Sequence, residues 1–212
     1  MPSVRPIPVT AFVDWNYQIH SANPQTSDCR VIALRTLDHL GRAIGRTLTS
    51  IDAVARFDVS LRLYHGWHKG FQPTDNRRAL ADVGAGADFS ALSTRANVQI
   101  RPDFSYGDRL MSALDRRLHT RLSIHLPNTL RRRGKTDDLE EKMVDTAIAA
   151  DVVDIAHREP DRWILVVGDD DDLVPPIFTA EAVRAEHKRR VLILRQRAEG
   201  QFLKLDGILE SQ

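Results

Sequence analysis

The sequence predicts an α/β fold, a three-layer α/β/α sandwich with a mostly parallel central sheet. Short apolar runs typical of buried strands alternate with longer segments whose apolar residues recur at helical spacing. No internal repeat or low-complexity stretch interrupts this alternation. Adjacent parallel strands need right-handed crossover connections, and these place helices on both faces of the sheet. The 212 residues, of which 42% are hydrophobic and 28% charged, suit a single soluble domain.

The first half of the chain is expected to begin with a central strand. Its apolar run is rich in β-branched residues and stops at Asp14. A long helix should follow, because apolar residues recur at helical spacing after Ser27 and Asp28, either of which can cap the first turn. The expected elements are a strand at 9–13, a helix from 28 to about 51, a strand at 59–64, a helix from about 72 to 92 and a strand at 98–100.

The second half begins with a basic segment at about 105–138. Its apolar residues follow neither the helical nor the strand periodicity well, and we interpret it as a partly helical loop. Asp137 or Asp138 should then cap a helix that carries an apolar stripe and ends near Glu159. The remaining expected elements are a strand at 163–167, the aspartate run 169–172, a helix from about 175 to 187 and a strand at 191–194.

The net charge of +1 conceals a division of charges along the chain. Residues 101–135 include nine basic and three acidic side chains, whereas residues 136–172 include thirteen acidic and three basic ones. Such sorting permits one surface that attracts a polyanion beside another that concentrates carboxylates. Solvated charge runs without a function are the alternative explanation.

Two acidic strand ends should meet at one edge of the sheet. Ligands of open parallel sheets bind beyond the carboxyl ends of the strands, where Asp14 and the run 169–172 both fall. One aspartate is enough to cap the next helix. Adjacent carboxylates repel by roughly 4 kcal/mol at about 4 Å and an effective dielectric of about 20, so four of them need a cation, proton uptake or full exposure. Carboxylate and water oxygens suit Mg²⁺ or Mn²⁺, and the sequence therefore predicts a divalent metal site, with a solvated helix cap as the alternative.

The helix expected to include Glu140 to Asp145 supplies a further acid. Asp145 flanks its apolar stripe, and Lys142 shares a face with Asp145 at a spacing of three. An ordinary surface ion pair is the alternative role for Lys142. Asp151 lies about 120° around the helix from Asp145, so we expect it to be structural or to support the site from behind.

Three segments, in this order, resemble the NYN domains, a branch of the PIN-like metal-dependent ribonucleases, whose fold is Rossmann-like. They are Phe12-Val13-Asp14-Trp15-Asn16, Glu141-Lys142-Met143-Val144-Asp145 with Asp151, and Val166-Val167-Gly168-Asp169-Asp170-Asp171-Asp172-Leu173-Val174-Pro175. The resemblance covers most of the chain and implies one NYN or PIN-like domain over residues 1–212.

The resemblance also assigns roles to single residues. Asp14 resembles the metal-binding acid of the first strand, Asn16 the polar residue that follows it, and Asp145 the acid of the helix. The family usually places that polar residue three positions after the acid, whereas Asn16 follows Asp14 by two.

The aspartate run can be aligned with the family in two ways. Alignment on Leu173 and Pro175 makes Asp170 and Asp172 the two acids, with Asp169 beside them as a further candidate ligand. Alignment on Gly168 selects Asp169 and Asp171 instead. Both registers stay open at the level of the sequence.

The implied activity is hydrolysis of phosphodiester bonds, in RNA by family resemblance, with one or two Mg²⁺ or Mn²⁺ ions held by Asp14, Asp145, Asp170 and Asp172. Lys142 could hold a phosphate. Backbone contacts to the nucleic acid would come from Arg131, Arg132, Arg133 and Lys135, with an exposed basic loop as the alternative.

Two other functions compete with a nuclease. A catalytically weak nucleic-acid-binding or regulatory module would keep the same fold, and the spacing of Asn16 makes that alternative possible. A phosphotransfer enzyme with an aspartyl phosphate also uses strand-end aspartates, but a phosphatase of the haloacid dehalogenase type would carry a second acid where Asn16 stands. Trp67 and Phe71 could stack on a nucleobase, although packing over the sheet edge is commoner for such residues.

A cytoplasmic location is expected from three features. The single cysteine, Cys29, cannot form an internal disulfide, the N-terminal residues lack the apolar core of a signal peptide, and no apolar run approaches a membrane span. The sequence leaves the oligomeric state open, with a homodimer among the alternatives.

Overall fold

The structure is a computed structural model, and it describes residues 5–113, 129–132, 139–184 and 190–195. Its centre is a parallel sheet with the strand order β10-β9-β1-β2-β5, to which β6 adds by pairing with β2. The strands are β1 (Ile7–Asp14), β2 (Phe57–Tyr64), β5 (Val98–Ile100), β6 (Ser105–Tyr106), β9 (Trp163–Val167) and β10 (Val191–Leu194). The predicted α/β fold with a mostly parallel sheet is confirmed.

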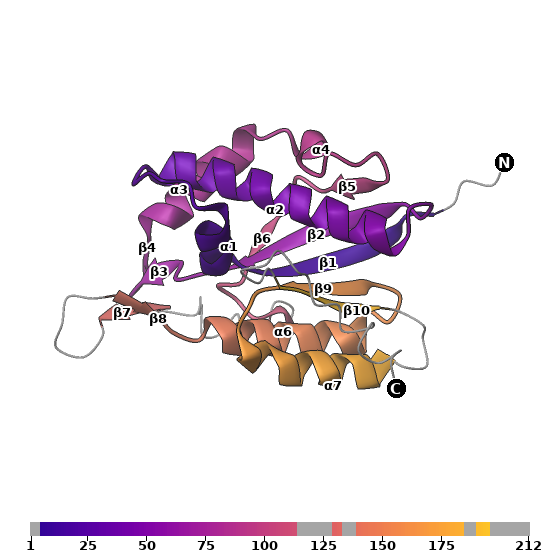
Figure 1. Cartoon of the computed structure of the whole chain (residues 1–212). Helices are drawn as coiled ribbons and strands as arrows, with labels where there is room; N and C mark the ends of the chain where they lie inside the picture. Colours follow the sequence, from indigo (N-terminus) through magenta and orange to yellow (C-terminus); the bar gives the residue numbers. More distant parts are fainter. Residues whose placement is uncertain (1–4, 114–128, 133–138, 185–189, 196–212) are drawn as a thin grey trace.

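Helices cover both faces of this sheet (Figure 1). One layer contains α1 (Trp15–Ala22), α2 (Cys29–Ile51), α3 (Asp75–Gly86) and α4 (Phe89–Leu92), and the other contains α6 (Val144–Arg158) and α7 (Val174–Arg184). Short 3-10 turns lie at Met111–Ala113 and Asp171–Leu173.

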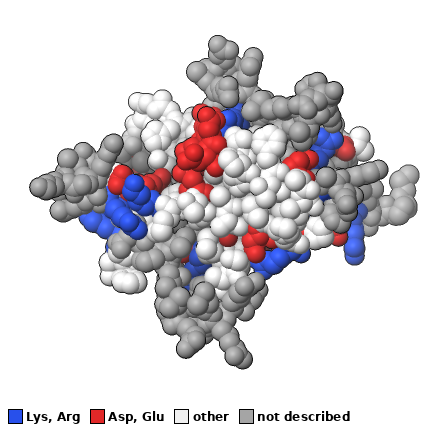
Figure 2. Space-filling view, turned by 90° about the horizontal axis from the view of Figure 1, so that it is seen from below, with Lys and Arg blue, Asp and Glu red and all other residues white. Residues whose placement is uncertain are grey.

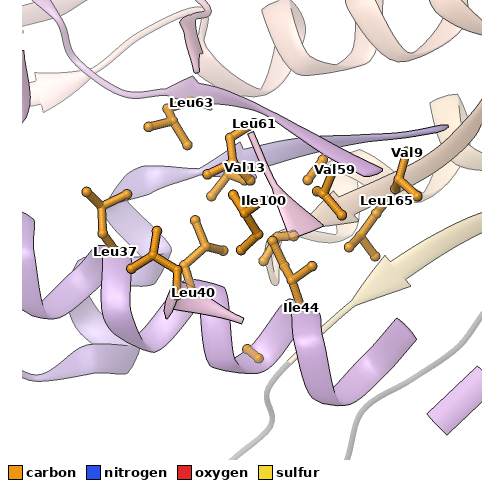
Figure 3. Packing of buried hydrophobic residues seen from close by; sticks show 14 of the residues in the cluster. Val9, Val13, Leu37, Leu40, Ile44, Val59, Leu61, Leu63, Ile100 and Leu165 are labelled. Carbon is orange, nitrogen blue, oxygen red and sulfur yellow. The ribbon is translucent and has the colours of Figure 1, made fainter. Parts of the chain in front are cut away.

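Two hydrophobic clusters hold the layers together, one on each face of the sheet. Figure 3 shows the larger one, in which Leu37, Leu40 and Ile44 of α2 point toward apolar side chains of the sheet. The smaller cluster joins the other face to α6 and α7. Alternate residues of β1 serve the two clusters, Val13 the larger and Phe12 the smaller, as expected of a strand buried on both faces.

Two small antiparallel hairpins lie beyond the carboxyl end of β2, next to each other in Figure 1. The first pairs β3 (His68–Lys69) with β4 (Gln72–Pro73), and the second pairs β7 (Leu130–Arg132) with β8 (Leu139–Glu141). The backbone N–H of His68 donates to Oγ1 of Thr129 at 3.1 Å, which ties the first hairpin to the second.

Most predicted elements are confirmed, but the helices differ in detail. Asp28 caps α2 by accepting from the N–H groups of Arg30 and Val31. The helix expected from about 72 to 92 is divided into α3 and α4, because α3 ends at Gly86 and Asp88 caps a new turn by accepting from Ser90 N–H at 3.0 Å. Helix α1, directly after Asp14, had not been predicted.

The largest error concerns the start of α6. A helix beginning after Asp137 or Asp138 was expected, but those two residues lie outside the described part, and Leu139–Glu141 form a strand. Pairing with β7 satisfies the backbone of this stretch, and Lys142 N–H donates to Thr129 O at 2.9 Å. Met143, with a left-handed φ of 67°, then turns the chain into α6. Glu141 and Lys142 are therefore not on the helix of Asp145.

Of the described helices, none is long and apolar enough to cross a membrane.

Candidate active site

The carboxyl ends of β1 and β9 lie side by side and bring the predicted acidic segments together. The two strands are parallel neighbours, and Val13 of β1 pairs with Val167 of β9. Gly168 follows Val167, and a Cβ atom placed on it would lie 3.5 Å from Cβ of Asp14. The expected meeting of the two strand ends at one sheet edge is confirmed.

Asp14 ends β1 and caps α1. Its Oδ1 accepts a hydrogen bond from Tyr17 N–H at 3.0 Å, a local bond that fixes the carboxylate at the sheet edge. Burial raises the pKa of Asp14 from 3.8 to about 6, and the charges of Glu141 and Asp145 add to this, against the opposing effect of the Tyr17 bond. Ionisation of Asp14 is therefore unfavourable in the absence of a cation, because the carboxylate is largely removed from water and lies near other acids.

Asp145 enters the site from the first turn of α6. Burial raises its pKa, and the charges of Asp170, Glu141 and Asp172 raise it further. A carboxylate in the first turn also faces the positive end of the helix dipole. Asp145 therefore links the acid of β1 to the acids that follow β9.

The members of the aspartate run differ in the charged groups that they affect. Asp170 and Asp172 are the members whose charges act on Asp145. Asp169 and Asp171 instead face the buried guanidinium of Arg195, at 3.9 Å and 2.7 Å. Arg195 also donates to Asp170 O at 2.8 Å, and Asp170 Oδ1 accepts from Asp172 N–H at 2.9 Å. Which two acids of the run are the metal ligands stays a prediction.

Seen from the side of α6 and α7, acidic side chains form one larger patch and several smaller areas (Figure 2). All four aspartates of the run are exposed, whereas Asp14 and Asp145 are partly buried. The site thus combines water-accessible carboxylates with carboxylates held in the protein.

Glu141 is an acid of this site that the sequence reasoning placed elsewhere. It lies at the end of β8, where Nδ1 of His65 and the backbone N–H of Gly66 both contact Oε1. Burial opposes its ionisation, but the bond and charge of His65 and the Gly66 bond hold its pKa below the usual range. The pairing of His65 and Glu141 joins residues far apart in the chain, so local spacing carried no signal for it.

The other predicted site residues lie around this cluster. Asn16, on α1, lines a pocket together with His65 and Glu141. Nζ of Lys142 forms an ion pair with Glu140 at 3.3 Å, which matches the surface-pair alternative although the partner differs from those expected.

The basic candidates lie partly within the described residues. Arg131 is exposed on β7 and lies opposite Glu140 of β8, and Arg132 ends the same strand. Arg133 and Lys135 lie outside the described residues.

Asp151 has the structural role expected of it. It is fully buried and accepts hydrogen bonds from Arg62 Nε at 2.8 Å, Tyr64 OH at 2.7 Å and Met111 N–H at 2.6 Å. This network anchors α6, and hence Asp145 at its start, to β2 and to the segment that follows β6.

The donor set is chemically suited to a divalent cation, since hard carboxylate oxygens are the ligands that Mg²⁺ and Mn²⁺ prefer. Across the described residues, however, no three such side chains already stand close enough together to hold an ion. A bound cation would therefore have to draw the carboxylates of Asp14, Asp145 and Asp170 inward.

Comparison of the chain with protein-family models, with curated protein sequences and with solved structures gives no match.

Proposed function

We propose that this protein is a metal-dependent nuclease that hydrolyses phosphodiester bonds, with RNA as the substrate that its resemblance to NYN domains implies. The observation that carries the proposal is the convergence of acids from three separate segments, Asp14 after β1, Asp145 on α6 and Asp170 after β9. Structural needs do not explain this convergence, because one aspartate suffices for each helix cap.

The residues that would hold the metal are Asp14, Asp145, Asp170 and Asp172, with Glu141 added from the structure. Raised pKa values at Asp14 and Asp145 are what uncompensated, partly buried carboxylates display, and a divalent cation would reverse them. When bound, Mg²⁺ or Mn²⁺ supplies an activated water and charge stabilisation for the phosphate.

The chain's own residues would prepare this chemistry by holding the ligands in place. The Tyr17 N–H fixes Asp14, and Arg195 orders the loop that bears Asp170 and Asp172. His65 and Gly66 keep Glu141 ionised and oriented. Arg131, exposed at the hairpin next to the acids, would contribute backbone contacts to a nucleic acid.

The test is cleavage of a labelled single-stranded RNA, with an RNA hairpin and a DNA strand for comparison, in Mn²⁺, Mg²⁺ or EDTA. Wild type should cut only with metal, and Asp14→Asn should lower the rate at least about a hundredfold. Asp82→Asn is the matched control, because Asp82 is exposed on α3 and far along the chain from every acid of the site. Cutting in EDTA, or by Asp14→Asn at the wild-type rate, would contradict the proposal.

A second function is favoured by one observation, the lack of a ready-made metal cluster among the described residues. A nucleic-acid-binding module with the same fold would bind RNA and leave it intact under every metal condition. Binding without cleavage in the same experiment would select this function.

A further inference from the structure

Two pockets merge into one groove beside the acidic site. The inner pocket has a volume of about 400 Å³ and is lined by Asn16, His65 and Glu141, among others. The outer pocket, of about 830 Å³, reaches Lys69 and Arg78. Both pockets share the same four lining residues, Thr74, Asn76, Leu130 and Leu139. We call the joined space the hairpin groove, because β3–β4 and β7–β8 form much of its walls.

The walls of the hairpin groove are fixed by hydrogen bonds. Oγ1 of Thr74 donates to Gly66 O at 3.2 Å and also caps α3. Thr129, almost fully buried, joins His68 of the first hairpin to the second. Gly66 packs so closely against Leu130 that an added Cβ would lie 3.0 Å from the Leu130 side chain. The groove therefore exists before any ligand binds.

The inner end of the hairpin groove offers amide groups suited to an unpaired base. The side chain of Asn16 has no hydrogen bond with any described residue, and Nδ2 of Asn76 lies 2.8 Å from Nε2 of His65. His65, which is 8% exposed, also contacts Glu141, so this end adjoins the acids directly. Amides carry both donors and acceptors and can match the edge of a nucleobase.

The outer end offers a cation and a nearby aromatic ring. Lys69 is exposed and forms no ion pair within the described part of the chain. The hairpin turns through Gly70, whose φ of 63° suits glycine at the first position of a two-residue loop. The next residue, Phe71, is 80% exposed. An exposed phenyl ring beside a lysine is the combination that binds single strands, the ring by stacking and the lysine through phosphate.

We propose that the hairpin groove binds a single strand of nucleic acid, with one base in the inner pocket near Asn16 and Asn76 and the strand leaving past Lys69 and Phe71. The strand would then continue to the acids and be cleaved there, and this step rests on the proposed nuclease function. A duplex does not suit the groove, because paired and stacked bases cannot present their Watson–Crick edges to the amides or a face to Phe71.

The experiment measures binding apart from cleavage, by fluorescence anisotropy of labelled single-stranded RNA and DNA and of the RNA duplex in EDTA. Phe71→Ala should weaken single-strand binding about tenfold, the loss expected for one stacked base. Lys69→Ala should weaken it and lower the slope of log affinity against log salt by about one. The controls are Val54→Ala, at an exposed position before β2, and Arg46→Ala, on the exposed side of α2.

The inner pocket has its own test. Wild type should prefer one of the four RNA homopolymers, and Asn16→Ala should reduce that preference without a change in melting temperature, since the Asn16 side chain has no hydrogen bond to lose with the described residues. Equal affinity of wild type for all four homopolymers would overturn the placement of a base there.

The outcomes separate this inference from the proposed function. Binding that depends on Phe71 and Lys69, without cleavage in any metal, would uphold the groove and reject the nuclease. In a different outcome, wild type cleaves RNA, but Phe71→Ala and Lys69→Ala bind the single strand as tightly as the control variants do. That outcome would reject the groove and leave the nuclease proposal standing. Preference for the duplex over the single strand would also reject it.

Discussion

The buried guanidinium of Arg195 lies 2.7 Å from the exposed carboxylate of Asp171. Because Arg195 also faces Asp169 and donates to the carbonyl of Asp170, one side chain contacts three members of the aspartate run. Asp169 and Asp171 share the positive charge of Arg195, whereas the charges of Asp170 and Asp172 raise the pKa of Asp145.

This division predicts different effects for neighbouring aspartates. Asp170→Asn should reduce metal-dependent cleavage at least about a hundredfold, because it removes a proposed ligand. Asp171→Asn should leave the rate within a few-fold of wild type, since it replaces an acid that faces Arg195. Single-turnover rates in Mn²⁺ measure both variants. The reverse order of effects would instead support the register that selects Asp169 and Asp171.

Asp14→Asn should stabilise the protein near neutral pH in EDTA. The folded state holds the Asp14 proton more tightly than the unfolded state, because burial raises the pKa to about 6. The stability that this gives wild type is complete below about pH 4 and is lost as the pH rises through 6. Asparagine keeps the cap on Tyr17 without a charge, so the variant should be more stable by about 1–2 kcal/mol at pH 7.5, after allowance for partial exposure.

Thermal melts at pH 4 and pH 7.5 test this linkage. The two proteins should differ little in stability at pH 4. Mg²⁺ or Mn²⁺ should then raise the melting temperature of wild type much more than that of the variant. An equal shift in both proteins would mean that the ion binds without Asp14.

The Asp151 network should contribute strongly to stability. Asp151→Asn removes the only acid that the described structure places on the buried Arg62 side chain, and should cost about 3 kcal/mol. Asp154→Asn, on the same helix, breaks a pair with Arg158 that is more exposed and should cost under about 1 kcal/mol. Urea unfolding at pH 7 compares the two variants. An equal loss of unfolding free energy in both variants would show that burial does not determine how much the Asp151 network contributes to stability.

Met143 is the junction at which the β8 strand turns into α6. Its φ of 67° is unfavourable for a residue with a side chain, and its side chain makes no capping hydrogen bond. Met143→Gly should therefore stabilise the fold by about 1 kcal/mol, as measured by urea unfolding. Met143→Ala is the control, because alanine keeps the Cβ and should give no such gain. A loss of stability in the glycine variant would indicate that packing of the Met143 side chain outweighs the backbone strain.

The strands and the meeting of acidic strand ends could be predicted from the sequence because both depend on local signals. A β-branched run followed by Asp14 indicates a buried strand and its end, and parallel order then places such ends on one edge. The start of α6 could not be predicted in this way. Residues 139–141 lie next to a strongly helical segment, and only pairing with the distant residues 130–132 makes them a strand.

The same reason explains which parts of the site were missed. Arg195 selects among the aspartates, and His65 orients Glu141, through contacts between segments distant in the chain. Asn16 follows Asp14 closely in sequence, yet α1 carries it to the hairpin groove. Motif spacing therefore predicted that the acidic ends of β1 and β9 meet, and it could not predict which side chains orient the acids.

The position of β1 in the middle of the sheet affects the order in which the protein can be made. On the ribosome, β1 and β2 are synthesised early, but the neighbour on the other side of β1 is β9, which follows α6. Asp14 therefore emerges long before Asp145 and Asp170, and a nascent chain that stops short of β9 carries no assembled acid cluster. Such long-range pairing is also slow to form. The proposed nuclease activity would therefore be absent from the nascent chain until its last third had folded.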